Sequence, residues 1–392
     1  MSRPVLAPRS SAGYVVALSS LAASLLLLPA RPAAAQDGAF SQTNLVSDIP
    51  GLAQTLDPQL LNPWGISFTP TSPFWVSDAG TGVSTLYNGA GVKQGLVVTI
   101  PGPGGAVPGV PTGQTFNSTG SFALPSGGNA VFIFASATGT ISAWGPSAGT
   151  TAVTAVNGFG SGASYTGVAV SGTGANARLY AANFGNGRID VFDGTFAPVL
   201  AGSFVDPTIP AGYAPFNVQN IGGQIVVTYA LKDPVTGRAV QGGANNGFVS
   251  VFDVSGTFLR RLASDGFLNS PWGLTLAPAS FGPFGGDLLI GNFGNGTINA
   301  FDFLTGAFVG TISDPTGAPI VNEGLWGITF GNGANAGSTS VLYFAAGIQG
   351  EQHGLFGSIS TVPEPSTMAL LATGLAGLVS GGGLRRRKRT TG

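Results

Sequence analysis

The chain has 392 residues, a formal net charge of −1, one histidine and no cysteine, and 8% of its residues are charged while 43% are hydrophobic. This composition excludes a disulfide scaffold, a thiol nucleophile, a cysteine-ligated metal site and a metal site built from several histidines. The 64 glycines and 27 prolines are interleaved with short apolar runs, which favours many short strands and tight turns over disorder.

The first segment, 1–36, has the order of a secretory signal. Arg3 and Arg9 precede the apolar run Val15–Leu28, and three alanines at 33–35 follow as a small-residue cleavage site. The alternative is a transmembrane anchor, but a run of about 14 residues is short for a helix that must cross a bilayer. We therefore expect a signal peptide over 1–36 and an exported mature chain.

The body of the chain, 37–362, contains six copies of two landmarks. The first landmark is a short motif near the start of each copy: Pro63-Trp64-Gly65, Pro111-Thr112-Gly113, Tyr165-Thr166-Gly167, Pro215-Phe216-Asn217, Pro271-Trp272-Gly273 and Leu325-Trp326-Gly327. The second landmark is a glycine further along each copy: Gly82, Gly139, Gly187, Gly247, Gly296 and Gly354. Successive glycines are 48 to 60 residues apart, and such a period points to a propeller or another repeat array.

Each copy divides into four strands. In the third copy we expect strands at 168–170, 179–182, 188–192 and 198–204. We expect a type I′ hairpin turn at Asn186-Gly187, in which both residues need a positive φ. No stretch of the body has a sustained helical period. Six four-stranded sheets arranged radially predict an all-β fold, a six-bladed β-propeller.

The closure of the ring is also predicted. The sixth copy ends near residue 360, before it has a fourth strand, and the segment Thr43–Ile49 resembles outer strands such as Gly310–Asp314. We therefore expect the N-terminal strand to complete the last blade, which removes the free edges of an open ring.

The repeat pattern resembles the NHL repeat. Its order is Pro-x-Gly-aliphatic, then Leu-Tyr-x-Ala-Asn, then Gly-Asn-Gly-Arg-Ile-x-Val-Phe-Asp, and it is best at 165–193 and 271–302 and fair at 63–88. The whole chain is similar to a family of exported propellers that carry a PEP-CTERM tail. The resemblance supports the propeller fold and implies no chemistry for particular residues.

The last segment, 363–392, has three parts. Pro363-Glu364-Pro365 is followed by the apolar stretch Met368–Leu384 of about 17 residues, and then by the basic cluster Arg385–Arg389. The stretch is at the lower limit for a transmembrane helix, and the basic cluster is expected to stay in the cytoplasm. This order resembles the PEP-CTERM sorting tail of Gram-negative bacteria. The resemblance implies recognition by an exosortase and the secretion machinery, cleavage, and delivery to the envelope or the extracellular polymer; the alternative is a plain membrane anchor without processing.

The body is acidic once the two ends are set aside. Of the 15 basic residues, three lie in 1–36 and five in 363–392, and Glu364 is one of the 16 acidic residues, so the body has 7 basic and 15 acidic residues and a net charge of −8. This balance excludes a nucleic-acid partner, which needs basic residues to neutralise phosphates. It also gives little attraction to anionic lipid.

The candidate ligand site is at the mouth of the propeller channel. In each blade, the turn between the second and third strands emerges on the same face as the connection between blades, where loops on a rigid scaffold can bind a ligand. Asp78, Asn183 and Asn292 lie just before such turns, and Glu323 lies in a connection. We predict that any ligand binds among these four residues. The alternative is that they only cap turns.

Three tryptophans, Trp64, Trp272 and Trp326, recur at one position of the innermost strands. They either form a sugar-stacking or apolar platform on the channel face or pack the blades together, as large aromatic side chains do. His353, close to Glu351, is the one place for histidine acid–base chemistry, and a solvated loop position is the alternative.

The function classes left open are binding, structure and catalysis. The absence of a dense acid–base cluster favours an exported binding or structural module in the envelope or extracellular matrix, with a polymer such as extracellular polysaccharide, a small ligand or an envelope protein as its partner. The alternative is a metal-assisted, lactonase-like hydrolase or lyase. That enzyme would need Glu323, Asp78 and Asn217 or Asn183 to hold a divalent cation such as Ca²⁺. The sequence does not identify the ligand.

Overall fold

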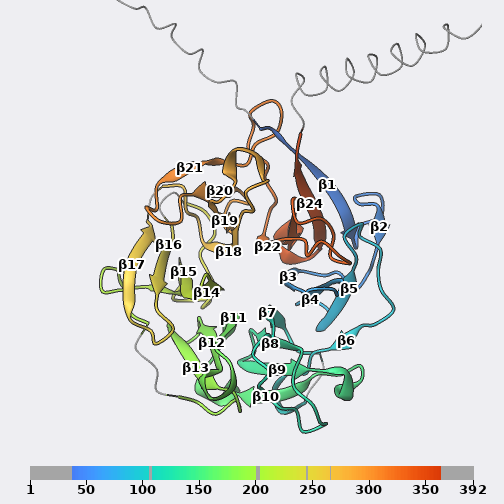
Figure 1. Ribbon diagram of the computed structural model, residues 1–392, viewed down its shortest axis with the longest axis vertical. Helices are drawn as coiled ribbons and strands as arrows, with labels where there is room; N and C mark the ends of the chain where they lie inside the picture. Colours follow the sequence, from blue (N-terminus) through green and yellow to red (C-terminus); the bar gives the residue numbers. More distant parts are fainter. Residues whose placement is uncertain (1–37, 106–107, 200–203, 244–245, 265, 363–392) are drawn as a thin grey trace, which may run out of the picture. The chain divides into compact units, whose positions relative to one another are not determined.

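The computed structural model describes residues 38–105, 108–199, 204–243, 246–264 and 266–362. These residues form six β-sheets arranged in a ring, with the first strand of each sheet nearest the centre (Figure 1). The predicted all-β, six-bladed β-propeller is confirmed. The predicted signal peptide and the predicted C-terminal transmembrane helix lie outside the described residues. Within the described residues, no helix is long and apolar enough to cross a bilayer.

The first three blades follow one another along the chain. Blade one contains β3 (Pro63–Ser67), β4 (Phe74–Asp78), β5 (Val83–Tyr87) and β6 (Val98–Thr99). Blade two contains β7 (Pro111–Phe116), β8 (Phe132–Ser136), β9 (Thr140–Trp144) and β10 (Val153–Asn157). Blade three contains β11 (Tyr165–Ser171), β12 (Arg178–Asn183) and β13 (Arg188–Asp193).

The last three blades include the closure. Blade four contains β14 (Tyr213–Ile221), β15 (Gln224–Leu231), β16 (Phe248–Phe252) and β17 (Phe258–Ala263). Blade five contains β18 (Pro271–Leu276), β19 (Leu288–Asn292), β20 (Ile298–Phe301) and β21 (Phe308–Thr311). Blade six contains β22 (Leu325–Phe330), β23 (Leu342–Ala346), β24 (Leu355–Thr361), β1 (Phe40–Ser47) and β2 (Thr55–Leu56). Short helices lie in the connections: η1 (Pro103–Gly105), η2 (Pro146–Ala148), η3 (Phe159–Ser161), η4 (Gly174–Asn176), η5 (Gly282–Phe284) and α1 (Ile348–Glu351).

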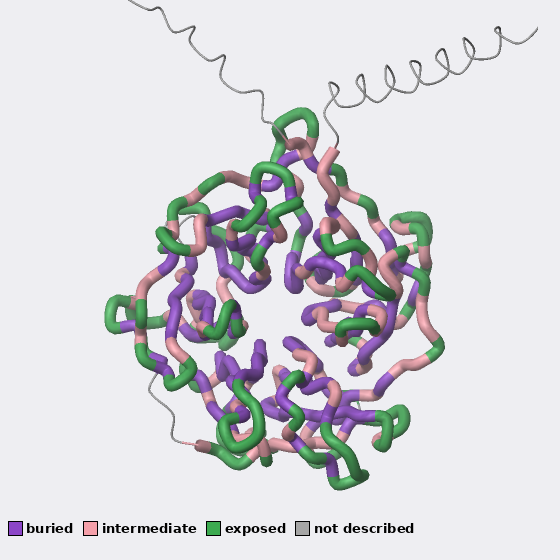
Figure 2. The backbone as a smooth tube through the Cα atoms, viewed as in Figure 1, coloured by how far each residue is buried: buried purple, intermediate pink, exposed green. Residues whose placement is uncertain are grey.

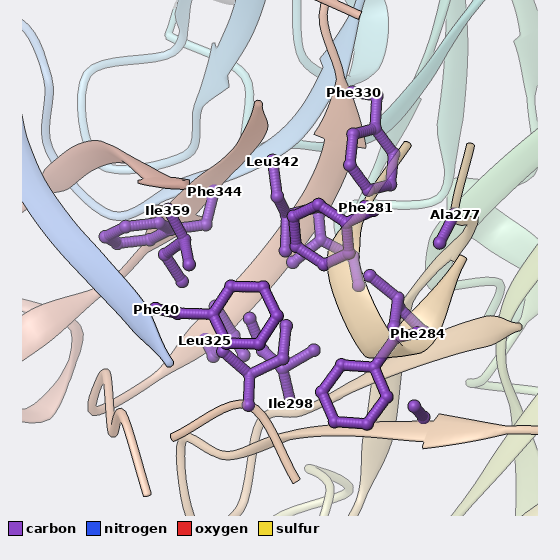
Figure 3. Close-up of a cluster of buried hydrophobic side chains, with 14 of the residues drawn as sticks. Phe40, Ala277, Phe281, Phe284, Ile298, Leu325, Phe330, Leu342, Phe344 and Ile359 are labelled. Carbon is purple, nitrogen blue, oxygen red and sulfur yellow. The ribbon is translucent and has the colours of Figure 1, made fainter. Parts of the chain in front are cut away.

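The N-terminal strand closes the ring as predicted. β1 pairs antiparallel with β24, from Phe40 opposite Thr361 to Ser47 opposite Leu355. Phe40 is 1% exposed, and its ring lies 5.0 Å from that of Phe281 and 5.7 Å from that of Phe284, measured between centroids (Figure 3). β1 therefore adds a hydrogen-bonded strand to blade six and an apolar side chain to the packing against blade five.

The hairpin turn of blade three differs from the prediction. Asn183 pairs with Arg188, so the loop holds four residues and not two. Gly187 has a φ of 67°, but Asn186 does not have a positive φ, so the type I′ prediction is wrong. The two-residue turn needs two left-handed residues, whereas this longer loop needs one, which glycine supplies without strain.

The predicted outer strand of blade three, at 198–204, is only partly within the described residues. Pro198 forms an isolated bridge with Phe192, and the Val199 N–H donates to the Val191 carbonyl over 2.9 Å. These contacts continue the ladder outward from β13, and the rest of that strand stays a prediction.

Residues in the strands are more deeply buried than residues in the connections. Figure 2 shows buried residues concentrated in the strands and exposed residues in the loops between them. All five residues of β4, β8, β9, β19 and β23 are buried, because each of these strands has a neighbouring blade on both faces. These fully buried strands thus provide a fixed base for the turns at the mouth.

Candidate functional site

The strand register makes two positions equivalent in all six blades. In each blade the first residue of the opening motif pairs with a residue of the second strand: Pro63 with Asp78, Pro111 with Ser136, Tyr165 with Asn183, Pro215 with Tyr229, Pro271 with Asn292 and Leu325 with Ala346. This partner is the last residue of the second strand in every blade except blade four, where β15 continues to Leu231. The next residue of each opening motif forms what we call the strand ring: Trp64, Thr112, Thr166, Phe216, Trp272 and Trp326. The residue after each second-strand partner forms the turn ring: Ala79, Ala137, Phe184, Ala230, Phe293 and Gly347.

The aromatic members of both rings pack into one cluster. Trp326, which is 1% exposed, stacks on Trp64 with centroids 3.4 Å apart and on Phe293 with centroids 3.9 Å apart. Its edge contacts are with Phe216 and Trp272, each at 5.7 Å. We call Trp64, Phe184, Phe216, Trp272, Phe293 and Trp326 the aromatic plug. It joins five of the six blades, so the tryptophans pack between blades and against one another.

A cavity of about 860 Å³ lies against the aromatic plug. Five plug residues line it, all except Trp272. Ala79 and Ala137 line it as well, at the turn-ring positions where blades three and five have phenylalanine. The small alanine side chains of blades one and two leave unfilled the volume that a phenylalanine would occupy, so the cavity follows directly from the sequence of the turn ring.

A long hairpin from blade four forms another wall of the cavity. The connection between β15 and β16 forms a hairpin in which Lys232 bridges Ala239 and the Asp233 N–H donates to the Arg238 carbonyl over 2.8 Å. We call Lys232–Val240 the blade-four hairpin. Asp233 Oδ1 accepts the N–H groups of Val235 and Thr236 over 2.8 and 2.7 Å, which fixes the turn at its tip.

The blade-four hairpin is joined to blade six by an ion pair. Arg238 Nη2 donates to both carboxylate oxygens of Glu351 over 2.7 Å, and both residues line the cavity. Asn62 Nδ2 donates to Glu351 Oε2 over 3.1 Å, while Asn62 Oδ1 accepts the Trp326 indole N–H over 3.2 Å. The Glu351 side chain is 11% exposed. A polar group is therefore fixed beside the apolar plug.

The backbone that carries Glu351 is strained. Gln349, Gly350 and Glu351 have φ values of 53°, 66° and 67°, and such a left-handed conformation costs about 1–2 kcal/mol for each residue with a side chain. The Glu323 carboxylate accepts the N–H groups of Gln349 and Gly350 over 3.2 and 2.9 Å. Glu323, one of the four predicted ligand residues, is exposed and does not line the cavity, but it holds the segment that presents Glu351.

The other three predicted ligand residues are buried and do not line the cavity. Asp78, Asn183 and Asn292 are each 0% exposed. Asn183 Oδ1 accepts the Ser164 N–H over 3.2 Å, and Asn292 Oδ1 accepts the Asn269 N–H over 2.9 Å. These amides tie the turn of one blade to the connection that leads into its first strand, so they stabilise the rim around the cavity.

Asp78 occupies the same position with a carboxyl group. Its Oδ2 accepts the Thr85 N–H over 3.2 Å and the Thr85 hydroxyl over 2.7 Å, while its Oδ1 is buried without a partner. Burial raises the pKa of Asp78 well above its ordinary value, and the nearby charge of Asp57 adds to the effect.

The residues proposed for a divalent cation do not fit such a site. Asp78 is engaged by Thr85, Glu323 by the backbone at 349–350, and the Asn217 amide donates to the Trp272 carbonyl over 2.7 Å. In the described part of the chain, no three His, Asp or Glu side chains gather where they could hold a metal ion. A Ca²⁺ ion needs six or more oxygen ligands directed at one point.

His353 contacts Asp48 and not Glu351. Its Nδ1 lies 2.6 Å from Asp48 Oδ2, and the Gly354 N–H donates to Asp48 Oδ1 over 2.8 Å. The side chain is 37% exposed. This arrangement fits the solvated loop position that the sequence left open.

Sequence reasoning missed several residues of the cavity wall. Phe216 occupies the tryptophan position of the fourth copy, and Phe184 and Phe293 lie inside the Asn-Phe-Gly-Asn-Gly motif, so the repeat alignment contained their signal. Arg238 and Glu351 had no comparable signal, because their contact joins residues 113 positions apart.

Comparison with known proteins supports both the fold and the tail. The family model of the PEP-CTERM protein-sorting motif matches residues 361–388, which include the predicted Pro363, Glu364 and Pro365. The motif implies processing by an exosortase, and export and membrane anchoring of a Gram-negative envelope protein. A protein of unknown function from Bacteroides thetaiotaomicron VPI-5482 has a similar structure, with a TM-score of 0.51 and 14% identity over 83% of this chain and 77% of that one.

Two viral proteins are similar to most of this chain. "Uncharacterized protein R648" of Acanthamoeba polyphaga mimivirus is 34% identical over 325 residues, which cover 80% of this chain and 78% of the relative. "Uncharacterized protein L690" of the same virus is 35% identical over 332 residues, which cover 80% of this chain and 84% of the relative. The chain therefore belongs to the protein family that includes these two mimivirus proteins.

Proposed function

We propose that this protein is an exported binding protein that takes a small ligand in the cavity beside the aromatic plug. The observation that carries the proposal is the cavity of about 860 Å³, which combines an apolar wall with the Arg238–Glu351–Asn62 group. Ligand sites in proteins are commonly cavities of about 300–1,000 Å³, mostly apolar, with a few fixed polar groups.

Two features favour binding over a purely structural role. A structural plug is most stable when it is filled, because an empty apolar space loses packing contacts. Here Ala79 and Ala137 leave space where phenylalanine occurs in two other blades. The left-handed backbone at 349–351 also costs free energy and serves to present a carboxylate to the cavity.

The matched substitutions Ala137→Trp and Ala175→Trp test the proposed site. Ala137 lines the cavity, whereas Ala175 lies in η4, in the connection between the first two strands of blade three. With environment-sensitive dyes as probes, we expect saturable one-to-one binding that Ala137→Trp abolishes and Ala175→Trp leaves intact. Equal binding by the two variants, or no binding by the wild type, would overturn the proposal.

A lactonase-like hydrolase at the same mouth is the competing function, although the residues expected to hold its cation are engaged by other groups. The two functions differ in their products, because a binding protein leaves its ligand unchanged. The test is incubation with ester and lactone substrates with Ca²⁺ and with a chelator. Turnover that needs the metal and is lost in Ala137→Trp would replace the binding role by catalysis.

We also propose that the protein works in the envelope or extracellular matrix, anchored by its C-terminal helix until it is processed.

A further inference from the structure

The charged groups in and beside the cavity wall balance. Asp233, Glu351 and Arg238 line the cavity, and the Lys232 ammonium lies over the ring of Phe184, which also lines it. Both oxygens of Glu351 accept from Arg238, and Asp233 Oδ1 is engaged by the turn of the blade-four hairpin. An ion in the cavity would therefore lose hydration without a net attraction from the wall. An anion would also be repelled by the body of the chain, whose net charge is −8.

The aromatic wall does not favour a cation either. A cation binds over the face of an aromatic ring, where the electron density is high, while the ring edge is electropositive. Both faces of Trp326 are covered, by Trp64 at 3.4 Å and Phe293 at 3.9 Å. The Lys232 ammonium lies over the Phe184 ring, 5.9 Å from its centroid. These ring faces are therefore not free to bind a cationic ligand.

The same wall contains a hydrogen-bond donor without an acceptor. The Trp64 indole N–H is buried and has no partner, while the Trp272 N–H donates to the Thr166 carbonyl over 3.1 Å and the Trp326 N–H to Asn62. Trp64 is 8% exposed and lines the cavity. A buried N–H without an acceptor is costly, so a ligand oxygen that the Trp64 ring turns to meet gains a hydrogen bond that the protein itself does not make.

We infer that the ligand of the cavity is a neutral, largely apolar molecule that carries an accepting oxygen, such as the carbonyl of a ketone, ester or amide. The balanced charges of the wall give neither an anion nor a cation a net attraction, the covered ring faces of Trp326 and Phe184 give a cation no further site, and the Trp64 N–H favours an acceptor. This inference rests on the proposed binding function and names the chemical class of its ligand.

Three dyes of different charge test the ligand class. Prodan is a neutral aromatic ketone, anilinonaphthalene sulfonate is an anion, and thioflavin T is a cation. Titrated into the mature protein and followed by fluorescence, Prodan is expected to bind at least about tenfold more tightly than either charged dye, because a charged dye gives up hydration that the balanced wall does not replace. Binding of all three dyes with equal affinity would overturn the inference and leave the proposed function standing. Binding of none would overturn both.

Removing one negative charge tests the electrostatic part of the inference. Asn in place of Asp233 keeps the oxygen that accepts from Val235 and Thr236, so the hairpin turn survives. Asp233→Asn should raise the affinity for anilinonaphthalene sulfonate about threefold and change that for Prodan less than about 1.5-fold, because solvent screens an exposed carboxylate. The matched control is Asp302→Asn, because Asp302 caps the β20–β21 turn in the same way and does not line the cavity. Equal effects of the two substitutions would contradict the inference.

Removing the indole N–H tests the hydrogen-bonding part. Trp64→Phe keeps an aromatic ring in the plug and removes the donor. We expect it to weaken Prodan binding about tenfold, the range for losing one buried hydrogen bond, while the affinity for phenylnaphthylamine, a neutral dye without oxygen, changes less than about threefold. Trp272→Phe is the control, because the N–H of Trp272 is already donated within the protein. Equal weakening of both dyes by Trp64→Phe would show that only packing was lost.

Discussion

At the scale of single residues, one repeat position carries two kinds of side chain. Asn183 and Asn292 satisfy their amides by joining a turn to the neighbouring connection. Asp78 has the same place in blade one but is a carboxyl, with Oδ1 buried and unpartnered. A neutral amide fits such a position at low cost, whereas a carboxylate has to give up its hydration. Burial therefore raises the pKa of Asp78.

The raised pKa predicts how stability depends on pH. Because the folded state holds the Asp78 proton more tightly than the unfolded state, its contribution is complete below the ordinary pKa and is lost as the pH rises through the folded pKa. Asp78→Asn should therefore reduce the loss of stability between about pH 4 and about pH 8, and raise the free energy of unfolding at pH 8 by about 1–3 kcal/mol. Urea unfolding at several pH values measures this.

Asp206 serves as a control, because its pKa is shifted in the opposite direction from that of Asp78. Burial opposes ionisation there, but hydrogen bonds from Arg261 and Ser250 outweigh it and hold the pKa of Asp206 at about 2. Its stabilising contribution is present above the ordinary pKa and is lost as the pH falls towards 2, so Asp206→Asn should lower the free energy of unfolding at neutral pH. If Asp78→Asn also destabilised the protein at pH 8, the account of Asp78 as a carboxyl whose pKa is raised by burial would be wrong.

At the scale of strands and turns, β1 holds the ring closed by both backbone and side-chain contacts. Besides its ladder with β24, the Ser47 hydroxyl donates to the Gly354 carbonyl over 2.8 Å. Gln42 and Asn322 exchange two amide hydrogen bonds, of 3.0 and 2.8 Å, across the boundary with the connection between blades five and six. The closure thus links the two ends of the repeat array, where an open ring would leave an unpaired edge.

The closure predicts a large cost for one substitution. Phe40→Ala should lower the free energy of unfolding by about 3–5 kcal/mol, because it leaves a cavity beside Phe281 and Phe284. Deletion of 40–50 should remove most of the stability. Thermal unfolding measures both, and Phe159→Ala, at a side chain that is 62% exposed, should stay within about 0.5 kcal/mol. An unchanged melting temperature in the deletion variant would refute the role of β1.

The strands and turns also show what the sequence could predict. Six copies of two landmarks fixed the blade count, and the unfinished sixth copy indicated the strand exchange. The pairing of Arg238 with Glu351 could not be predicted, because it depends on the direction in which the blade-four hairpin leaves its blade. The burial of Asn183 and Asn292 could not be predicted either, since the same residue types serve equally in exposed turns.

At the scale of the whole molecule, the start of the first propeller strand lies beside the end of the last one. Phe40, at the start of β1, pairs with Thr361, at the end of β24, and the sorting motif begins at residue 361. Cuts near Gln36 and Pro365 would leave this terminal ladder intact, because both positions lie outside the paired residues 40–361. The contacts that close the ring are therefore made within the propeller itself.

This arrangement predicts the form of the released protein. The basic cluster Arg385–Arg389 is expected to resist transfer across the membrane, so release requires a cut before it. Mass spectrometry of protein outside the cell should find a start near Gln36 or Asp37 and no peptide beyond about Pro365. Its melting temperature should equal that of a recombinant chain of residues 37–365, because neither cut reaches the β1–β24 ladder. Glu364→Ala, which alters the sorting motif alone, should keep the protein in the membrane with its propeller still folded. Peptides from Arg385–Arg389 on extracellular protein would show instead that the tail is exported uncut.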